Sequence, residues 1–388
     1  MSDTPFTRRF TEPPTGNGPL AGLRVSIKEL LDVAGYPTPA GTVGLREAPA
    51  ERDAPLVARL REAGAHLVGH TSMTQLVYSG LGVNPHTGSP DNPVRPGHIP
   101  GGSSSGGAVS VANGEADVAI GSDTGGSLRI PAAFCAIVGF KPTAAGVPRE
   151  GCVALSPSLD SLGPMARTVA DCARVWRVIA AREPQAATGR AALLLPANFG
   201  RDGLDEEVAH AFATALDAIA PHVDGIEEAA LPVLDAYGTH PVWHYAAVES
   251  RAAHPDLWER RDRLDPRVAS RMARADGVGA VDYAATLQAR SRLIEGFRAA
   301  LGEAVLVLPT VAIAPPAHAD LAADENYDRL NLMALRNTSL ANVMDGCSIS
   351  LPIGRGRPVG LMLTAPGGAD ERLLALAARL QPVLETVA

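Results

Sequence analysis

The sequence predicts one α/β/α domain in which helices cover both faces of a large, mixed, mainly parallel twisted sheet. Apolar runs that favour strands alternate with helical patterns, as in βαβ units. A chain of 388 residues with 46% hydrophobic residues can bury a substantial core. No linker of distinct composition divides it, so residues 1–388 are interpreted as a single domain, with residues 1–20 as an N-terminal arm.

The first elements after the arm follow a strand–helix–strand order. The alternating run at 23–27 predicts a strand. Asp53 is expected to cap a helix that ends before Gly64, because acidic side chains favour the N-cap and glycine favours the end of a helix. The run at 65–71 predicts the next strand. The small, apolar segment 110–120 predicts a buried helix that continues into a short strand.

The second half of the chain is predicted to be mostly helical before it returns to strands. Residues 183–298 are rich in alanine and form the helical middle portion, with the clearest amphipathic stretch at 205–220. Residues 304–316 are a continuous apolar run ended by prolines, which indicates a buried strand. Two more strands are expected within 347–366, and an amphipathic helix at 369–384.

Composition excludes several classes of function. The net charge of −8 and the scattered arginines argue against a nucleic-acid partner. Neither a secretory signal nor an apolar run of membrane length is found, so we expect a cytoplasmic protein with no membrane partner. The cysteines are far apart and form no CxxC pair, so no metal site, cofactor or disulfide framework is expected; they are Cys135, Cys152, Cys172 and Cys347.

The most informative segment is residues 101–142, the signature core. It contains two glycine- and serine-rich loops, GGSSSGG at 101–107 and GSDTGGS at 121–127. Glycine at this density suits loops in which backbone N–H groups approach a reacting atom. Serine hydroxyls can act as a nucleophile or as a proton relay. The segment therefore indicates acyl-transfer chemistry, provided that the chain supplies a base.

Two lysines are candidates for that base. Lys28 stands at the end of a predicted strand, where α/β proteins place reactive groups. Lys141 precedes a proline in GFKPT and is interpreted as structural. An ordinary lysine has a pKa of about 10.4, so it must be buried or lie near other positive charges to act as a base at neutral pH.

These motifs resemble the amidase signature family of serine hydrolases. GGSSSGG, GSDTGGSLRIPA and the segment LRVSIKELLDVAG carry the resemblance, which is strong over residues 20–175 and weaker over 304–380. It implies a Ser-Ser-Lys triad in which Ser127 is the nucleophile, Ser103 follows a cis peptide bond and relays the proton, and Lys28 is the base. It also implies an oxyanion hole built from the N–H groups of Thr124, Gly125, Gly126 and Ser127.

Other residues of interest have simpler interpretations. Asp123 and Arg129 are the only charges in and beside the second loop and are expected to pair and brace it. Ser104 and Ser105 are interpreted as hydrogen-bonding supports. His240 and His244 are separated by Pro241, so they are not expected on one helical face as metal ligands. The loops lack the GK[ST] sequence of a phosphate-binding loop.

The resemblance implies an amidase that hydrolyses a small carboxylic amide to acid and ammonia through an acyl-enzyme, and that forms a possible homodimer. One alternative is the glutaminase subunit of a tRNA-dependent amidotransferase, but Leu335 stands near the position of its substrate-binding acidic residue. Another is a ureido-amide hydrolase of the allophanate or biuret type. A non-catalytic binding protein is disfavoured because all three triad residues are present. Gln75, Tyr78 and Cys347 are hypothesised to approach the acyl pocket.

Overall fold

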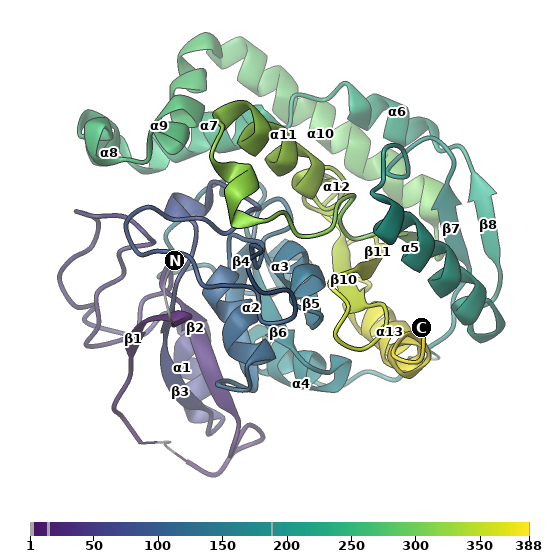
Figure 1. Cartoon of the computed structure of the whole chain (residues 1–388), viewed down its shortest axis with the longest axis horizontal. Helices are drawn as coiled ribbons and strands as arrows, with labels where there is room; N and C mark the ends of the chain where they lie inside the picture. Colours follow the sequence, from purple (N-terminus) through teal and green to yellow (C-terminus); the bar gives the residue numbers. More distant parts are fainter. Residues whose placement is uncertain (1–3, 14–15, 188, 388) are drawn as a thin grey trace.

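The computed structural model describes residues 4–13, 16–187 and 189–387 and contains one eleven-stranded sheet within them (Figure 1). The spatial order of its strands is β1-β3-β2-β4-β6-β5-β10-β11-β9-β7-β8. Their bounds are β1 Phe6–Arg9, β2 Arg24–Lys28, β3 His66–Thr71, β4 Val118–Asp123, β5 Val138–Lys141, β6 Ser161–Ala166, β7 Leu193–Pro196, β8 Ile226–Ala229, β9 Val305–Pro309, β10 Cys347–Pro352 and β11 Gly360–Ala365.

Thirteen α-helices and several short 3-10 turns connect these strands within the described ranges. The helices are α1 Pro55–Glu62, α2 Ser105–Ala112, α3 Arg129–Phe134, α4 Val169–Ala180, α5 Glu206–Ile219, α6 Pro232–Gly238, α7 Trp243–Ala253, α8 Pro255–Glu259, α9 Pro266–Ala273, α10 Ala280–Leu301, α11 Asp324–Leu335, α12 Ser339–Val343 and α13 Asp370–Leu384. None of the described helices is long and apolar enough to cross a membrane. Helices α6 to α11 gather above the strands in Figure 1.

The predicted coverage of both sheet faces is confirmed by the alternation along β9. Val305 and Val307 join the core that packs against α1, α4, α5 and α13, whereas Leu306 and Leu308 join the core under α6, α10 and α12. Successive strand residues point to opposite faces, so a continuous apolar run is the pattern expected of a strand that is covered on both sides.

The prediction of a mixed sheet is confirmed, but the expectation of mainly parallel pairing is wrong. Among the described strands, only the pairs β2–β3, β2–β4, β7–β8 and β7–β9 are parallel. The other six neighbouring pairs are antiparallel. An apolar run indicates a strand but not its direction, and the short connection between β10 and β11 requires antiparallel pairing.

Three local expectations are also corrected. The N-terminal arm, expected to be loose because residues 1–20 are polar and rich in proline and glycine, contributes strand β1, which pairs with β3 at the edge of the sheet. The helical middle portion contains β7 and β8 and so extends the other edge. The N-cap of α1 is Ala54 rather than Asp53. The Asp53 carboxylate instead accepts a hydrogen bond from the Ala34 N–H at 2.8 Å and pairs with Arg61.

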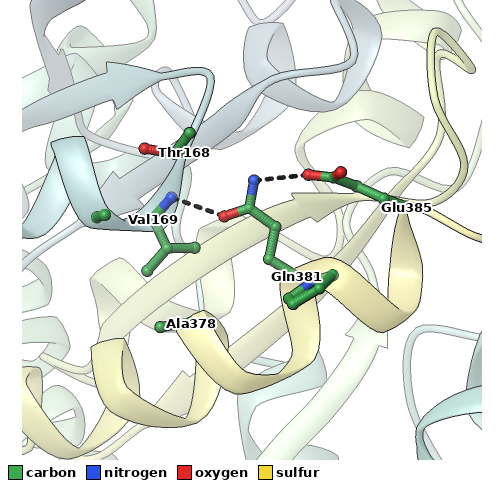
Figure 2. A pocket seen from close by; sticks show the side chains of 7 residues that line it. Thr168, Val169, Ala378, Gln381 and Glu385 are labelled. Carbon is green, nitrogen blue, oxygen red and sulfur yellow. Dashed lines mark hydrogen bonds between the residues drawn. The ribbon is translucent and has the colours of Figure 1, made fainter.

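Helices α4 and α13 are joined on their shared face of the sheet by one buried amide. Figure 2 shows the Gln381 side chain of α13 directed at the start of α4, where its Oε1 accepts a hydrogen bond from the Val169 N–H at 2.8 Å. Its Nε2 donates to Glu385 at 3.0 Å. This contact satisfies one of the N–H groups that every helix leaves free at its first turn.

Candidate active site

Lys28 and Ser103 are brought together by the central strands. Lys28 is the last residue of β2 and is fully buried, and its Nζ donates hydrogen bonds to Ser103 Oγ at 2.7 Å and to Ser122 Oγ at 2.9 Å. Ser122 lies on the neighbouring strand β4. The peptide bond between Gly102 and Ser103 is cis. The Lys28 amine is therefore held by two hydroxyl groups, and Ser122 is a partner that sequence reasoning missed.

Burial lowers the pKa of Lys28 from its ordinary value of 10.5 to about 7. Cys152 and the carboxylates of Asp123 and Asp160 act in the opposite direction, but the loss of hydration outweighs them. A lysine with this pKa is partly neutral near pH 7, where an ordinary lysine is almost fully protonated, and only a neutral amine can accept a proton.

Ser127 lies in the loop between β4 and α3, beside Ser103. The Ser104 N–H donates to the Ser127 carbonyl at 3.3 Å, which joins the two serine loops through their backbones. Ser127 is 3% exposed and Ser103 is fully buried. Within the described chain, no hydrogen bond joins the hydroxyl groups of Ser103 and Ser127. The two loops are thus adjacent, but the hydrogen bond between Ser103 and Ser127 that the implied relay needs is not formed among the described residues.

The second loop is braced by a buried ion pair, as expected from the sequence. Arg129 Nη2 lies 2.8 Å from Asp123 Oδ1, and both side chains are fully buried. The Asp123 carboxylate also accepts hydrogen bonds from the N–H groups of Gly126 at 2.8 Å and Leu128 at 3.1 Å. Burial acts to raise the pKa of Asp123, but Arg129, Lys141 and Asn342 together outweigh it, and the pKa falls below its usual value.

This contact changes the predicted set of oxyanion donors. The Gly126 N–H is committed to Asp123 Oδ1 and does not point freely into the site. In the part of the chain that the structure describes, the N–H groups of Thr124, Gly125 and Ser127 have no hydrogen-bond partner. Three of the four expected donors are therefore available to a developing negative charge.

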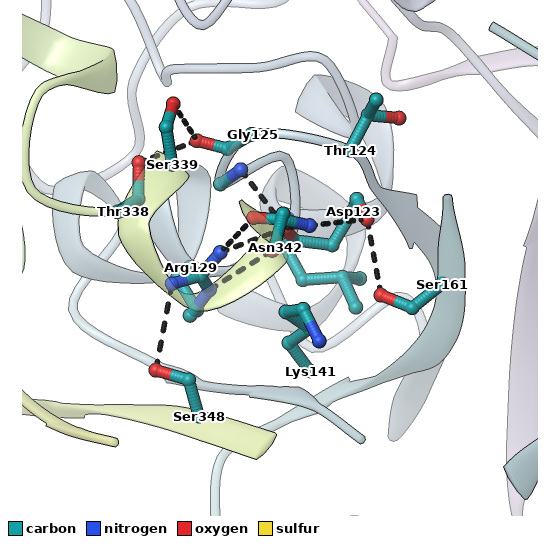
Figure 3. A network of polar contacts seen from close by, with 12 residues as sticks. Asp123, Thr124, Gly125, Arg129, Lys141, Ser161, Thr338, Ser339, Asn342 and Ser348 are labelled. Atoms are coloured by element: carbon teal, nitrogen blue, oxygen red, sulfur yellow. Dashed lines mark hydrogen bonds and ion pairs between the residues drawn. The ribbon is translucent and has the colours of Figure 1, made fainter. Parts of the chain in front are cut away.

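A segment far away in the sequence, residues 338–342, is hydrogen-bonded to the second loop. Asn342 of α12 accepts a hydrogen bond from Arg129 at 2.8 Å and donates to the Asp123 carbonyl at 2.9 Å (Figure 3). Thr338 and Ser339, which precede it, donate to the Gly125 carbonyl at 2.6 and 3.2 Å. Sequence reasoning did not assign these residues to the loop, because they lie more than 200 residues away from it along the chain.

A second set of polar contacts connects the loop to helix α7. Thr124 Oγ1 donates to the buried carboxylate of Asp160, which also accepts the Ser156 N–H at 3.0 Å. Ser156 Oγ then donates to Glu249 of α7 at 2.7 Å. Burial raises the pKa of Asp160 to about 6. The hydroxyl of Thr124 is therefore linked to the helical middle portion through Asp160, Ser156 and Glu249.

Lys141 occupies a structural position. Its Nζ donates to the carbonyls of Gly346 at 2.6 Å and Pro142 at 3.0 Å, and it makes no hydrogen bond to either serine of the expected triad. Burial lowers its pKa to about 8. Figure 3 places it below the Asp123–Arg129 pair. A low pKa alone therefore does not distinguish a base from a support; contact with Ser103 does.

Of the residues hypothesised near the acyl pocket, three have their polar atoms occupied elsewhere. Gln75 contacts Thr42 and the Asp265 N–H, the Tyr78 hydroxyl contacts α7, and Cys347 Sγ contacts the end of β11. Leu335 is different. A Cβ added to Gly125 would lie 3.3 Å from Leu335 Cδ2, so this apolar side chain borders the second loop.

No group of three histidine, cysteine or acidic side chains in the described ranges could hold a metal ion. His240 Nε2 and the Tyr245 hydroxyl are 2.8 Å apart, and His244 Nδ1 lies 2.8 Å from Thr286 Oγ1, so both rings are engaged within the helical middle portion. All four cysteines are free thiols.

Comparison with known proteins supports the sequence resemblance. The profile of the Amidase family matches residues 8–374. The chain belongs to the Amidase family. Its membership, together with the names of its relatives, makes it a hydrolase that acts on amide C–N bonds. A solved structure described as an amidase superimposes with a TM-score of 0.84 at 33% identity, covering 95% of this chain and 86% of that one.

The relatives within the Amidase family have several different names. The 2-amino-5-chloromuconic acid deaminase of Comamonas testosteroni is 35% identical over 95% of this chain and 82% of its own length. The indoleacetamide hydrolase of Pseudomonas syringae is 33% identical over 94% and 86%. The glutamyl-tRNA(Gln) amidotransferase of Haloarcula marismortui has a subunit that is 31% identical over 92% and 94%. The family membership therefore establishes the class of bond but leaves the substrate open.

Proposed function

We propose that this amidase hydrolyses a small carboxylic amide to acid and ammonia through an acyl-enzyme on Ser127. The observation that carries the proposal is the 2.7 Å hydrogen bond from Lys28 to Ser103 at a buried lysine with a pKa of about 7. A base near neutral pH that is already in contact with a serine is suited to proton transfer. We also propose that it works in the cytoplasm, where its four free thiols stay reduced.

In the proposed mechanism, neutral Lys28 accepts the proton of Ser103 while Ser103 Oγ accepts that of Ser127. Ser127 Oγ forms a bond to the amide carbon, and the N–H groups of Thr124, Gly125 and Ser127 stabilise the negative oxygen. The proton returns through Ser103 to the amide nitrogen as the C–N bond breaks. Water, activated by the same relay, then releases the acid from Ser127.

The relay requires one adjustment. Ser103 and Ser127 are not hydrogen-bonded to each other in the described structure, so one serine side chain must turn about its Cα–Cβ bond before the proton can pass. Catalytic contacts are often long in a free enzyme and shorten when substrate binds. Because Lys28 holds Ser103 at 2.7 Å, we expect Ser127 to be the residue that turns.

The surroundings of the loop favour a free-standing amidase over a glutaminase. Glutamine carries an ammonium group, which needs an acidic or polar partner in the acyl pocket. The side chains nearest to Gly125 are those of Ser339 and the apolar Leu335, and neither carries the negative charge that an ammonium group prefers. We therefore expect an acyl group with an uncharged part at this position. No contact in the structure favours a ureido-amide over a carboxylic amide, so both are included in the test.

The test measures ammonia release from a panel of aliphatic, aryl and ureido primary amides and from glutamine. We expect release from at least one primary amide by the isolated chain, and loss of nearly all of it in Ser127→Ala, Ser103→Ala and Lys28→Ala. Ser105→Ala is the matched control, because its hydroxyl contacts the Ser72 carbonyl outside the proposed relay. Full activity in Ser127→Ala would overturn the proposal.

The covalent step is tested separately. Hydroxylamine added during turnover should divert the acyl group from Ser127 into a hydroxamate. In a separate sample without hydroxylamine, the mass of acid-quenched protein should increase by the mass of the acyl group. A modified peptide that contains Ser103 but not Ser127 would show that the roles of the two serines are assigned wrongly. Activity that appears only when partner proteins and charged tRNA are added would favour the glutaminase alternative.

A further inference from the structure

A cavity of about 430 Å³ lies at the N-terminal edge of the sheet. Thr7 and Arg8 of β1, Glu29 after β2 and His70 of β3 contribute to its lining. Glu47 and His86, from two loops, also line it and are exposed to solvent. A volume of this size is within the range of pockets that hold small metabolites. We refer to it as the Glu29 cavity.

The Glu29 cavity is separate from the candidate active site. Lys28 directs its amine at Ser103, whereas Glu29, in the turn that follows β2, directs its carboxylate at Thr7 of β1. Lys28, Ser103, Ser122 and Ser127 are not among the residues that line the cavity. The two sites therefore share no residue.

Glu29 supplies a buried acceptor without a partner. Its side chain belongs to a residue that is only 2% exposed, and its Oε2 accepts a hydrogen bond from Thr7 Oγ1 at 2.8 Å. Its Oε1 is buried and forms no hydrogen bond among the described residues, although the Gly41 N–H is close enough to the carboxyl group to act on its pKa. Buried carboxylate oxygens are costly to leave unpaired, so an unpaired one that lines a cavity indicates a ligand with hydrogen-bond donors.

His70 adds a second acceptor. Its Nε2 lies 3.2 Å from the Leu31 carbonyl, which can only accept, so Nε2 carries the proton and Nδ1 keeps a free lone pair. Nδ1 has no partner in the described part of the chain. Burial lowers the pKa of His70 to about 4, which keeps the ring neutral. Two acceptors and no donor are thus contributed by Glu29 Oε1 and His70 Nδ1.

Arg8 contributes a positively charged hydrogen-bond donor to the cavity. Its side chain is exposed and lines the cavity, and no carboxylate of the described residues pairs with it. Its positive charge lowers the pKa of both Glu29 and His70, so it acts on both acceptors. A simple cation would be repelled by this guanidinium. A ligand that has an ammonium group and a carboxylate would satisfy all three residues.

We propose that the Glu29 cavity binds a free α-amino acid, whose ammonium group donates to Glu29 Oε1 and His70 Nδ1 and whose carboxylate pairs with Arg8. A metal ion is disfavoured, because the described residues of the cavity do not form a set of three ligands. The ammonium group prefers the ionised carboxylate. Burial raises the pKa of Glu29 to about 7 against the influences of Thr7, the Gly41 amide and Arg8, so binding should release protons near neutral pH.

The experiment is calorimetric titration of the whole chain with alanine, serine, valine, glutamate and lysine, one at a time. Ethylamine and propionate are matched probes, because each keeps one charged group of alanine. We expect at least one amino acid to bind, and both alanine fragments to bind about tenfold more weakly than alanine or worse. Binding should also strengthen as the pH rises from about 6 to about 8, as Glu29 ionises with Arg8, Glu47, His70 and His86 around it.

Two variants assign the site. Glu29→Gln keeps an acceptor for the Thr7 hydroxyl. Arg8→Gln changes an exposed residue, so this variant is expected to fold. Each should weaken amino-acid binding by about tenfold or more. Arg9→Gln is the matched control, because the neighbouring Arg9 pairs with Glu115 instead. The absence of binding by every amino acid, or equal binding by wild type and both variants, would overturn the proposal.

Discussion

Replacement of Lys28 by methionine should make the protein inactive and, at low pH, more stable. Burial lowers the pKa of Lys28 from 10.5 to about 7, so the unfolded chain binds a proton between these values that the folded chain does not. Stability of the wild type therefore rises with pH across that window. A difference of one pKa unit between the folded and unfolded chains corresponds to about 1.4 kcal/mol of stability, so the full lowering of the Lys28 pKa corresponds to about 5 kcal/mol.

The assay is urea unfolding of wild type and Lys28→Met at about pH 6 and about pH 9, followed by tryptophan fluorescence. The variant leaves Ser103 and Ser122 without their donor, a cost that does not depend on pH. We therefore compare the two proteins at each pH. The free energy of unfolding of the variant minus that of the wild type should be about 3 kcal/mol lower at the higher pH than at the lower pH, because only the wild type gains stability as the pH rises. The same difference at both would refute the reasoning.

Three further predictions follow from the same contacts. The value of kcat/KM should rise with pH through about 7, because only neutral Lys28 can act as a base; a flat profile from about pH 6 to about pH 8 would contradict this. Asn342→Leu should lower the free energy of unfolding by about 2–4 kcal/mol, measured in urea, because Asp123 and Arg129 each lose a buried partner; unchanged stability would count against the brace. Leu335→Asp should raise KM for an apolar amide by about tenfold in steady-state kinetics, and an unchanged KM would remove Leu335 from the acyl pocket.

The sequence was sufficient for strands β2, β3, β4, β9, β10 and β11 and for the two serine loops, but it did not reveal β1, β5, β6, β7 or β8. The loops around Ser103 and Ser127 are continuous motifs, and Lys28 follows an alternating run, so each could be found without coordinates. The Asp123–Arg129 pair was predictable because the two residues flank one short loop. Strand directions were not predictable, because buried strands that run either way have the same apolar pattern.

Contacts that depend on the fold could not be found in this way. Asn342 is 213 residues from Arg129, and the sequence around it does not indicate which loop it contacts, so only the packing of α12 reveals its role. The Gly126 N–H looked equivalent to its neighbours in the sequence. Its assignment to Asp123 depends on how one peptide is turned, and a sequence of glycines does not determine that orientation.

The distance between Arg129 and Asn342 along the chain has a consequence for biosynthesis. A ribosome adds about 5–20 residues per second, so the nascent chain carries its serine loops for roughly 10–40 s before Asn342 is made. Strand β10, which pairs with β5 behind the loop, is also synthesised after that delay. The growing polypeptide therefore exposes the proposed nucleophile, Ser127, before the segment that braces its loop has been made, and we expect hydrolytic activity to begin only when translation is nearly finished.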